Sequence, residues 1–404
     1  MLTHSFKVDK YVSLVAVSVP FLGYYGYGFL SFAFINICLL YLYVYIKTGR
    51  IHFSNAKFFY CYILYYFISR AILGTSFGDK IAPSVLFFFV YWCFLNENLK
   101  LSSFLKFYRI AAFINIVFFV VQELMYAIIG YRIFGIVSFL PSTLGNGEID
   151  MNSFAEKYSE AERSCAFFSE PAHFVQFLLP LLAIELLYVA NRKAYFRCVL
   201  YVLTLLGLAS GNALLGLFVV FLFYIVSLWK KMRSVLSIIC VFFVVAVTLS
   251  FVVYIMQTEY GKKLMDRQEQ LDPEPLHSSS GFIRIFRGYY VLDTMPSASK
   301  IFGLNSDDKL DDAIEACDVS TTFKEGDRYL NGVQKILVYT GYIGTILFII
   351  GLSQIYRGNN LAGKCCIAIF VSLSFIASIF FSYTMVFMLV CSSLMLKEKQ
   401  GILS

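Results

Sequence analysis

Charged residues are scarce in this 404-residue chain: only 15% are Asp, Glu, Lys or Arg, whereas 59% are hydrophobic and 18% are aromatic. Soluble domains carry about 25% charged residues. A mean hydropathy of +0.71 cannot be hidden in one water-soluble core, because such cores stop growing near ~250–300 residues. A disordered chain, a coiled coil and a soluble enzyme are therefore excluded. The composition predicts an all-α polytopic membrane protein.

Three stretches lack charge altogether: residues 11–46, 198–229 and 365–396. Each is longer than the ~20 apolar residues that one spanning helix needs. Basic residues flank every stretch at both ends, and basic residues stay on the cytoplasmic side of a membrane. Each stretch therefore predicts a two-helix hairpin that leaves and returns at the cytoplasmic face. Gly23–Gly28 and Ser210–Asn212 supply plausible outer turns.

Single apolar segments complete a map of about twelve transmembrane helices with both termini cytoplasmic. These segments are 58–78, 81–95, 110–129, 171–190, 235–255 and 335–355. The predicted inner segments hold 18 Lys or Arg against three acidic residues, which supports this orientation. The predicted organisation is helices 1–5 in 1–129, a first periplasmic loop 130–170, helices 6–9 in 171–255, a large periplasmic loop 256–334 and helices 10–12 in 335–404.

The sequence also lacks the common cofactor motifs. It contains no Walker motif, no glycine-rich dinucleotide loop and no Cys or His residues at zinc spacing. ATP-driven transport by this chain alone is thus excluded, and no cofactor, metal or nucleic acid is expected. Of the ten cysteines, only Cys165 and Cys317 fall in the predicted outer loops. A disulfide between these two is one alternative, and free thiols are the other.

The densest polar cluster closes the first outer loop, in the run Arg163-Ser-Cys-Ala-Phe-Phe-Ser169-Glu170-Pro171-Ala-His173-Phe. Ser169 is a good helix cap, and proline is tolerated in a first turn. The pattern predicts a helix that enters the membrane near Glu170 and offers an anion site at its N-terminus. Glu170 and His173 are three residues apart and share a helix face. The alternative is a capped helix with interfacial polar residues.

In the second outer loop, Arg284 and Arg287 lie three residues apart among Phe282, Phe286, Tyr289 and Tyr290. If this run is helical, both guanidinium groups emerge on one side, where they suit bidentate binding of phosphate oxygens. The alternative is an amphipathic helix whose arginines meet lipid phosphates. The acidic run 306–318 matches no calcium-binding spacing and is expected to be a solvated surface.

Three ionisable residues fall inside the predicted membrane segments: Arg70, Glu123 and Glu185. Such groups are costly in lipid and usually have a partner. Arg70 is expected to pair with one of the two glutamates. The pair would be a structural lock, with a role in lining a substrate cleft as the alternative.

Three features resemble the Wzy-type O-antigen and capsular polysaccharide polymerases, which are relatives of the O-antigen ligases. The block from Arg163 to Phe174 is similar to the arginine–aromatic–Glu-Pro stretch that opens a membrane helix after a periplasmic loop in these polymerases. The turn Ser210-Gly211-Asn212 is similar to their serine-containing turn. The run from Asn331 through Gly341 and Gly344 resembles the segment that re-enters the membrane after the large loop.

This resemblance implies a membrane glycosyltransferase of the bacterial inner membrane that needs neither metal nor nucleotide. The donor would be a glycan on undecaprenyl pyrophosphate, and the acceptor a lipid-linked repeat unit at the periplasmic face. Arg163, Arg284 and Arg287 would bind the pyrophosphate, and Glu170 or His173 would act as the base. Membrane lipid and a chain-length regulator protein are the further partners expected.

Two alternatives remain at this point. An O-antigen ligase typically places a histidine just before the final re-entrant helix, whereas this chain has Leu330-Asn331 there, which favours the polymerase. A flippase or secondary transporter would show inverted repeats and discontinuous helices. The chain has no evident internal repeat, and its 79-residue outer loop fits a carrier poorly.

Overall fold

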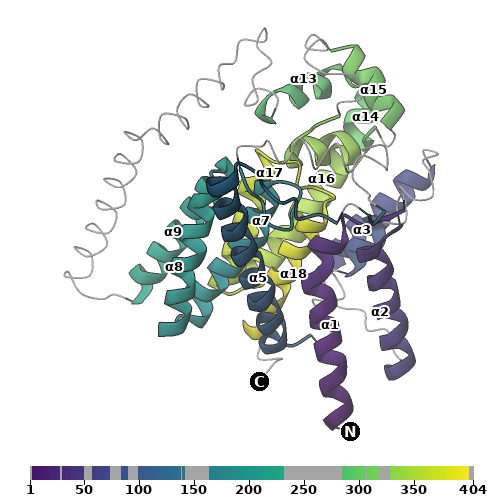
Figure 1. The fold of residues 1–404 in the computed structure, drawn as a ribbon. Coiled ribbons are helices and arrows are strands. Elements are labelled where there is room, and N and C mark those ends of the chain that lie inside the picture. Colours follow the sequence, from purple (N-terminus) through teal and green to yellow (C-terminus); the bar gives the residue numbers. More distant parts are fainter. Residues whose placement is uncertain are drawn as a thin grey trace. The chain divides into compact units, whose positions relative to one another are not determined.

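The computed structural model describes residues 2–27, 30–49, 57–72, 83–89, 99–137, 139–141, 163–231, 284–304, 307–317 and 328–399. Most of these residues are helical (Figure 1). The chain forms two compact units. The first comprises Met1–Leu217, Ile346–Phe370 and Phe381–Ser404, and the second Phe218–Thr345 and Val371–Phe380.

Within the described residues, four helical segments are long and apolar enough to cross a membrane: α5 (Leu101–Ile129), α7 (Pro171–Ile184) with the π-helix η2 (Glu185–Val189), α9 (Gly211–Lys231) and α16 (Gly332–Gly358). Shorter apolar helices accompany them. This set of long and short apolar helices is typical of a helical membrane protein, and it agrees with the class predicted from composition.

Each of the three charge-free stretches folds as two helices joined by a turn, as predicted (Figure 1). The helix pairs are α1 (Leu2–Leu22) with α2 (Phe32–Thr48), α8 (Arg192–Gly207) with α9, and α17 (Leu361–Ser374) with α18 (Tyr383–Lys399). The first turn contains a small antiparallel pair, β1 (Gly26–Tyr27) with β2 (Leu30–Ser31). Residues 58–78 are described over α3 (Lys57–Ile72) and 81–95 over a helical stretch 83–89, while 235–255 lies outside the described residues.

In the first unit, α7 is a deeply buried helix. It packs against α5, α8 and α18, while α1 packs against α2, α5 and α18. Every residue of α7 from Phe174 to Ile184 is buried. Ring centroids of Tyr108, Phe177 and Phe387 lie 4.9–5.2 Å apart, and the Tyr108 hydroxyl donates to the Phe177 carbonyl. Because protein surrounds α7, polar groups along it have partners other than lipid.

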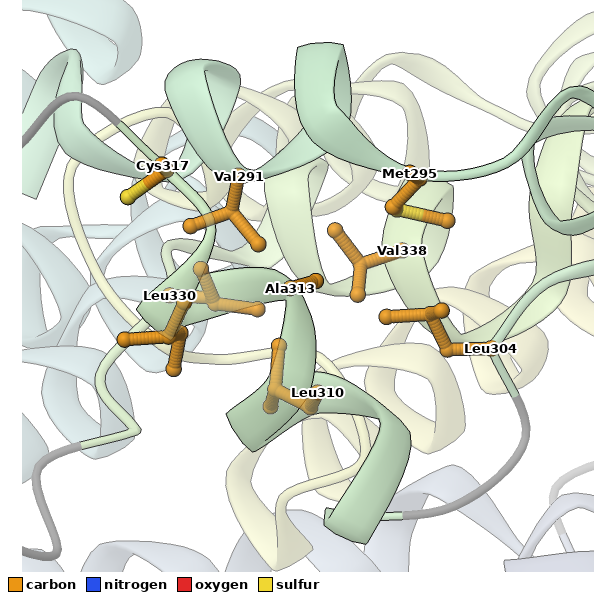
Figure 2. Close-up of a cluster of buried hydrophobic side chains, with 9 residues drawn as sticks. Val291, Met295, Leu304, Leu310, Ala313, Cys317, Leu330 and Val338 are labelled. Carbon is orange, nitrogen blue, oxygen red and sulfur yellow. The ribbon is translucent and has the colours of Figure 1, made fainter. Parts of the chain in front are cut away.

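The described part of the second unit includes three short helices, α13 (Arg287–Thr294), α14 (Ser297–Phe302) and α15 (Asp307–Glu315), packed beside the start of α16. Figure 2 shows the apolar cluster between them, with Val291, Leu310 and Val338 fully buried. The acidic run is therefore only half solvated. Its aspartates Asp308 and Asp311 are outside the core, but Leu310, Ala313 and Ile314 of the same helix lie in the core.

A capping box begins α16. The backbone N–H of Gln334 donates to Asn331 Oδ1 at 2.9 Å, and the backbone N–H of Asn331 donates to Gln334 Oε1 at 3.0 Å. The Asn331 side chain also donates to the carbonyls of Arg284 and Phe375, at 2.9 and 3.0 Å. Both side chains are almost fully buried. The pair thus ties three distant segments of this unit together through backbone groups that would otherwise be unpaired.

Helix α16 is interrupted at Gly341, where φ is 64° and ψ is −173°. The end of α14 passes so close that a Cβ on Gly341 would lie 2.3 Å from the Ile301 carbonyl oxygen. Just before the break, the Leu304 N–H donates to the Val338 carbonyl at 2.8 Å. Glycine is thus required at 341 for its left-handed φ and for the absence of a side chain.

Replacing Gly341 with Ala should destabilise the protein by about 2 kcal/mol, since the side chain adds strain at a positive φ and collides with backbone. The measurement is the thermal unfolding midpoint of the purified protein in detergent. Gly211→Ala is the matched control, because a Cβ there would meet no atom within 4 Å. Equal midpoints for the two variants would contradict the assigned role of Gly341.

Candidate functional site

The candidate site lies in the first unit, at the start of α7. The helix begins at Pro171 with Glu170 as its N-cap residue, as the sequence predicted. Ser169 is not the cap. Glu170 has the extended backbone of a cap residue (φ −144°, ψ 150°) but makes no side-chain capping bond, and its side chain is exposed. Pro171 has no N–H, and the His173 N–H donates to the Glu170 carbonyl at 3.1 Å, so an anion at this end would meet the positive end of the helix dipole rather than a set of open N–H groups.

His173 sits in the first turn of α7 between two hydroxyl groups. Its Nδ1 lies 2.9 Å from Ser169 Oγ and 3.0 Å from the hydroxyl oxygen of Tyr24. Tyr24 comes from the turn after α1, more than a hundred residues earlier in the chain. Burial raises the pKa of the Tyr24 hydroxyl well above its usual value, so this group stays protonated. Since Nδ1 is engaged by these hydroxyls, Nε2 is the ring nitrogen left for a substrate.

The part of the block that precedes α7, residues 163–170, has little regular structure. Side chains of α5 hold it in place. The Ala166 N–H donates to Gln122 Oε1 at 2.8 Å, and Gln122 Nε2 donates to the carbonyls of Ile133 and Ala166 at 2.7 and 3.3 Å. Asn115, two helical turns earlier, accepts from the Phe167 N–H at 3.4 Å. The rings of Phe118 and Phe167 stack at 4.2 Å. One face of α5 thus replaces the backbone partners that a strand would supply.

The chain after α5 packs against the same block from another side. A Cβ on Gly135 would lie 2.0 Å from the Ala166 carbonyl oxygen, so only glycine permits this approach. Arg132 is buried, with its guanidinium 3.3 Å from the centroid of the Tyr126 ring, and its Nε donates to Ser164 Oγ at 3.2 Å. These contacts fix the block between α5 and the segment that follows it.

Arg163 opens the block and reaches the turn between α8 and α9. Its guanidinium donates to the Ala209 carbonyl at 3.2 Å. Ala209 has a left-handed φ of 47°, and α9 begins two residues later at Gly211. The structure therefore brings together two features that lie far apart along the sequence, namely the block that begins with Arg163 and the serine-containing turn.

Glu185 is fully buried at the other end of α7, at the start of the π-helical turn. Its carboxylate accepts from Arg109 Nε at 2.5 Å and from a terminal nitrogen of Arg197 at 2.6 Å. These arginines belong to α5 and α8, so one carboxylate joins three helices. A π-helical turn changes the direction of side chains within a helix. Here the turn begins at Glu185, directly after the buried apolar residues of α7 end.

The expected partner of the two glutamates was Arg70, and the structure differs on this point. Glu123 contacts Arg132 at 3.7 Å and accepts from the Ser164 N–H at 3.3 Å. Arg70 is buried on α3, with its guanidinium 5.3 Å from the centroid of the Tyr66 ring. An arginine–carboxylate lock inside the membrane segments therefore exists at Glu185, but its arginines are Arg109 and Arg197.

In the second unit, Arg284 and Arg287 do not point the same way. Arg284 is exposed and precedes α13. Arg287 is the first residue of α13 and is fully buried, with one terminal nitrogen donating to the Tyr329 carbonyl at 3.2 Å. The prediction that both guanidinium groups emerge on one side is thus wrong, because Arg287 is turned into the core of the unit.

The cysteines and acidic residues form no further chemical centre in the described ranges. Cys165 and Cys317 are both buried free thiols, and the Cys165 thiol lies 2.7 Å from the Phe168 carbonyl oxygen. No three His, Cys, Asp or Glu side chains within those ranges gather in a way that could hold a metal ion.

Sequence reasoning missed Tyr24, Gln122, Asn115, Arg109 and Arg197. Asn115 and Gln122 gave a usable signal, since polar residues seven apart lie on one face of an otherwise apolar helix. Arg109 and Arg197 had been assigned to the charged ends of the predicted membrane segments. Tyr24 gave no local signal, since its contact with His173 depends on the tertiary fold.

Comparison with known proteins adds no relative: no protein-family model matches the chain, and no curated protein shows significant sequence similarity to it.

Gln122→Leu should release the block before α7, because it leaves the Ala166 N–H and two carbonyls without their amide partner. In a background where Cys165 is the sole cysteine, maleimide labelling of Cys165 should become roughly tenfold faster. Gln176→Leu, the same change at another buried glutamine, is the control and should label slowly. Equal rates in both variants would show that Gln122 does not hold the block.

Glu185→Gln should destabilise the protein by about 2 kcal/mol, because two arginines lose their shared carboxylate; their side chains are 33% and 27% exposed, so water offsets part of the loss. Asp311→Asn removes the carboxylate of an exposed pair with Arg328 and should cost less than about 1 kcal/mol. Thermal unfolding midpoints in detergent compare the two variants. A larger drop in the unfolding midpoint for Asp311→Asn than for Glu185→Gln would contradict the structural role of the Glu185 ion pairs.

Proposed function

We propose that this protein is a polysaccharide polymerase that extends a lipid-linked glycan at the outer face of the bacterial inner membrane. The observation that carries the proposal is the block from Arg163 to His173. It holds an exposed carboxylate and a histidine at the N-terminus of the buried helix α7, and it begins with an arginine that reaches the turn between α8 and α9. The resemblance of this block to the Wzy-type polymerases supports the same function.

The proposal includes the membrane arrangement expected from sequence: about twelve crossings, two long periplasmic loops and cytoplasmic termini. In that arrangement the start of α7 and the turn between α8 and α9 both lie at the periplasmic surface. This is where a saccharide on undecaprenyl pyrophosphate would be exposed. The end of α7 that carries Glu185 would then lie toward the cytoplasm.

The reaction is a displacement at the first carbon of the donor sugar. A hydroxyl oxygen of the acceptor repeat unit forms the new bond to that carbon. The bond between the carbon and the phosphate oxygen breaks, and undecaprenyl pyrophosphate leaves with the electron pair. The hydroxyl proton passes to a base. The protein must therefore stabilise negative charge on the leaving group and accept one proton.

Arg163 and the positive end of the α7 dipole are the proposed partners of the pyrophosphate in the first unit. In the second unit, Arg284 is exposed and can take the same role, whereas Arg287 is committed to the Tyr329 carbonyl. A buried arginine with a carbonyl partner is better explained as a structural group. The pyrophosphate role in the first unit is therefore proposed for Arg163, and in the second unit Arg284, not Arg287, is the arginine that stays open to a phosphate oxygen.

His173 is the proposed base, with Glu170 as the alternative. When the His173 proton sits on Nδ1, it donates to the oxygen of Ser169 or Tyr24, and Nε2 is free to accept the proton of the acceptor hydroxyl. Tyr24 and Ser169 are thus positioning residues that hold the ring. Glu170 is exposed beside it and can accept a proton directly.

The test uses cells that lack the gene and are complemented with single variants. Arg163→Ala and His173→Ala should each reduce elongation by roughly 100-fold, which leaves single repeat units in place of a ladder on gels of the surface polysaccharide. Arg328→Ala is the control, since this exposed arginine pairs with Asp311 and should leave the ladder normal. Normal ladders for Arg163→Ala and His173→Ala at normal protein levels would refute the assignment.

The same strain distinguishes the two alternative functions. Loss of an O-antigen ligase would leave polymerised glycan on its lipid carrier. A flippase or secondary transporter would move saccharide across proteoliposomes without lengthening it.

A further inference from the structure

The ion-paired end of α7 carries more positive than negative charge. Glu185 contributes one carboxylate, and Arg109 and Arg197 contribute two guanidinium groups. Lys106 precedes Arg109 by one turn on α5, and Lys193 precedes Arg197 by one turn on α8. Residues three or four apart share a helix face, so each arginine has an exposed lysine beside it. We call these four basic residues, with Glu185, the basic cluster.

The donors of the basic cluster outnumber its acceptors. A guanidinium group has five N–H bonds, and each arginine uses one hydrogen bond to Glu185. Arg197 Nε is buried and has no hydrogen-bond partner among the described residues. Because both arginine side chains are about one-third exposed, their remaining donors can reach a ligand at the surface.

The first turn of α8 is positively charged, although this end of a helix favours negative charge. The N-terminal end of a helix is positive and favours acidic residues, yet this turn contains no acidic residue and begins with Arg192 and Lys193. The carboxylate of Asp9 is committed to the start of α5, where it accepts from the Lys100 N–H and the Ser103 hydroxyl. An anion from outside the protein would offset this accumulation of positive charge.

An apolar face adjoins the basic cluster on the same helix. Phe196, Val199 and Leu203 are 78%, 58% and 62% exposed, and their spacing places them along one side of α8. Glu185 lies four residues from the end of the apolar span Pro171–Val189, so the cluster is near a membrane boundary. Charge at the boundary beside exposed apolar side chains is the pattern that an amphipathic lipid matches.

We propose that the basic cluster binds the phosphate of an anionic phospholipid, whose acyl chains lie along Phe196, Val199 and Leu203. Lys106 and Lys193 contact the phosphate, together with the donors of Arg109 and Arg197 that Glu185 does not use. Glu185 holds the two arginines at a fixed separation, so the lipid bridges α5 and α8. This binding site does not depend on the proposed enzymatic activity.

The test is native mass spectrometry of the full-length protein in detergent, titrated with phosphatidylglycerol or with phosphatidylcholine. The wild type should bind phosphatidylglycerol more tightly. The double variant Lys106→Gln/Lys193→Gln leaves the Glu185 contacts intact and should weaken phosphatidylglycerol binding roughly tenfold. Lys47→Gln/Arg357→Gln removes the same charge at exposed residues on α2 and α16 and should bind as the wild type does.

Three outcomes of the lipid titrations would overturn the proposal: equal affinity for the two lipids, equal weakening in the two double variants, or no weakening in either. A parallel titration with inorganic phosphate separates a lipid site from a simple anion site. Phosphatidylglycerol should raise the thermal unfolding midpoint of the wild type, and phosphate alone should not. The same rise with phosphate alone would show that the acyl chains make no contribution and would contradict the lipid assignment.

Discussion

The candidate site depends on the pairing of the Gln122 side chain with the backbone of Ala166. A segment without regular structure can be buried beside membrane helices only if its N–H and C=O groups find partners in the protein. Gln122 and Asn115 supply such partners from one face of α5, and Gly135 allows the neighbouring chain to approach. This arrangement fixes the backbone of the residues before α7. The positions of Arg163 and of the start of α7 depend on it.

The two ends of α7 serve different purposes under this account. Its start offers the positive end of the helix dipole, an exposed carboxylate and a histidine held by Tyr24 and Ser169, which suits the proposed glycosyl transfer. Its last turn carries a carboxylate that joins α5 and α8 through two arginines. A helix fixed at one end by ion pairs can present the other end with little movement, and preorganised groups of this kind are what stabilises developing charge.

Local patterns in the sequence predicted local structure well. Charge-free stretches became helix pairs, and Glu-Pro marked the start of α7, because both depend on neighbours along the chain. Contacts between distant residues were not predictable in this way. Arg70 was the only arginine inside a predicted membrane segment, but packing brought Arg109 and Arg197 to Glu185. Arg287 shares the sequence setting of Arg284, yet it is fully buried and donates to the Tyr329 carbonyl. Tyr24 reaches His173 only because α1 lies beside the site.

The most direct measurement of the central claim is elongation by the purified protein. The protein is reconstituted in lipid nanodiscs and given repeat units on undecaprenyl pyrophosphate, and product length is followed by mass spectrometry. The account predicts longer glycans together with free undecaprenyl pyrophosphate, and predicts that both products disappear in Arg163→Ala and His173→Ala while the Arg328→Ala protein remains active. Elongation at the wild-type rate by a correctly folded Arg163→Ala or His173→Ala protein would contradict it.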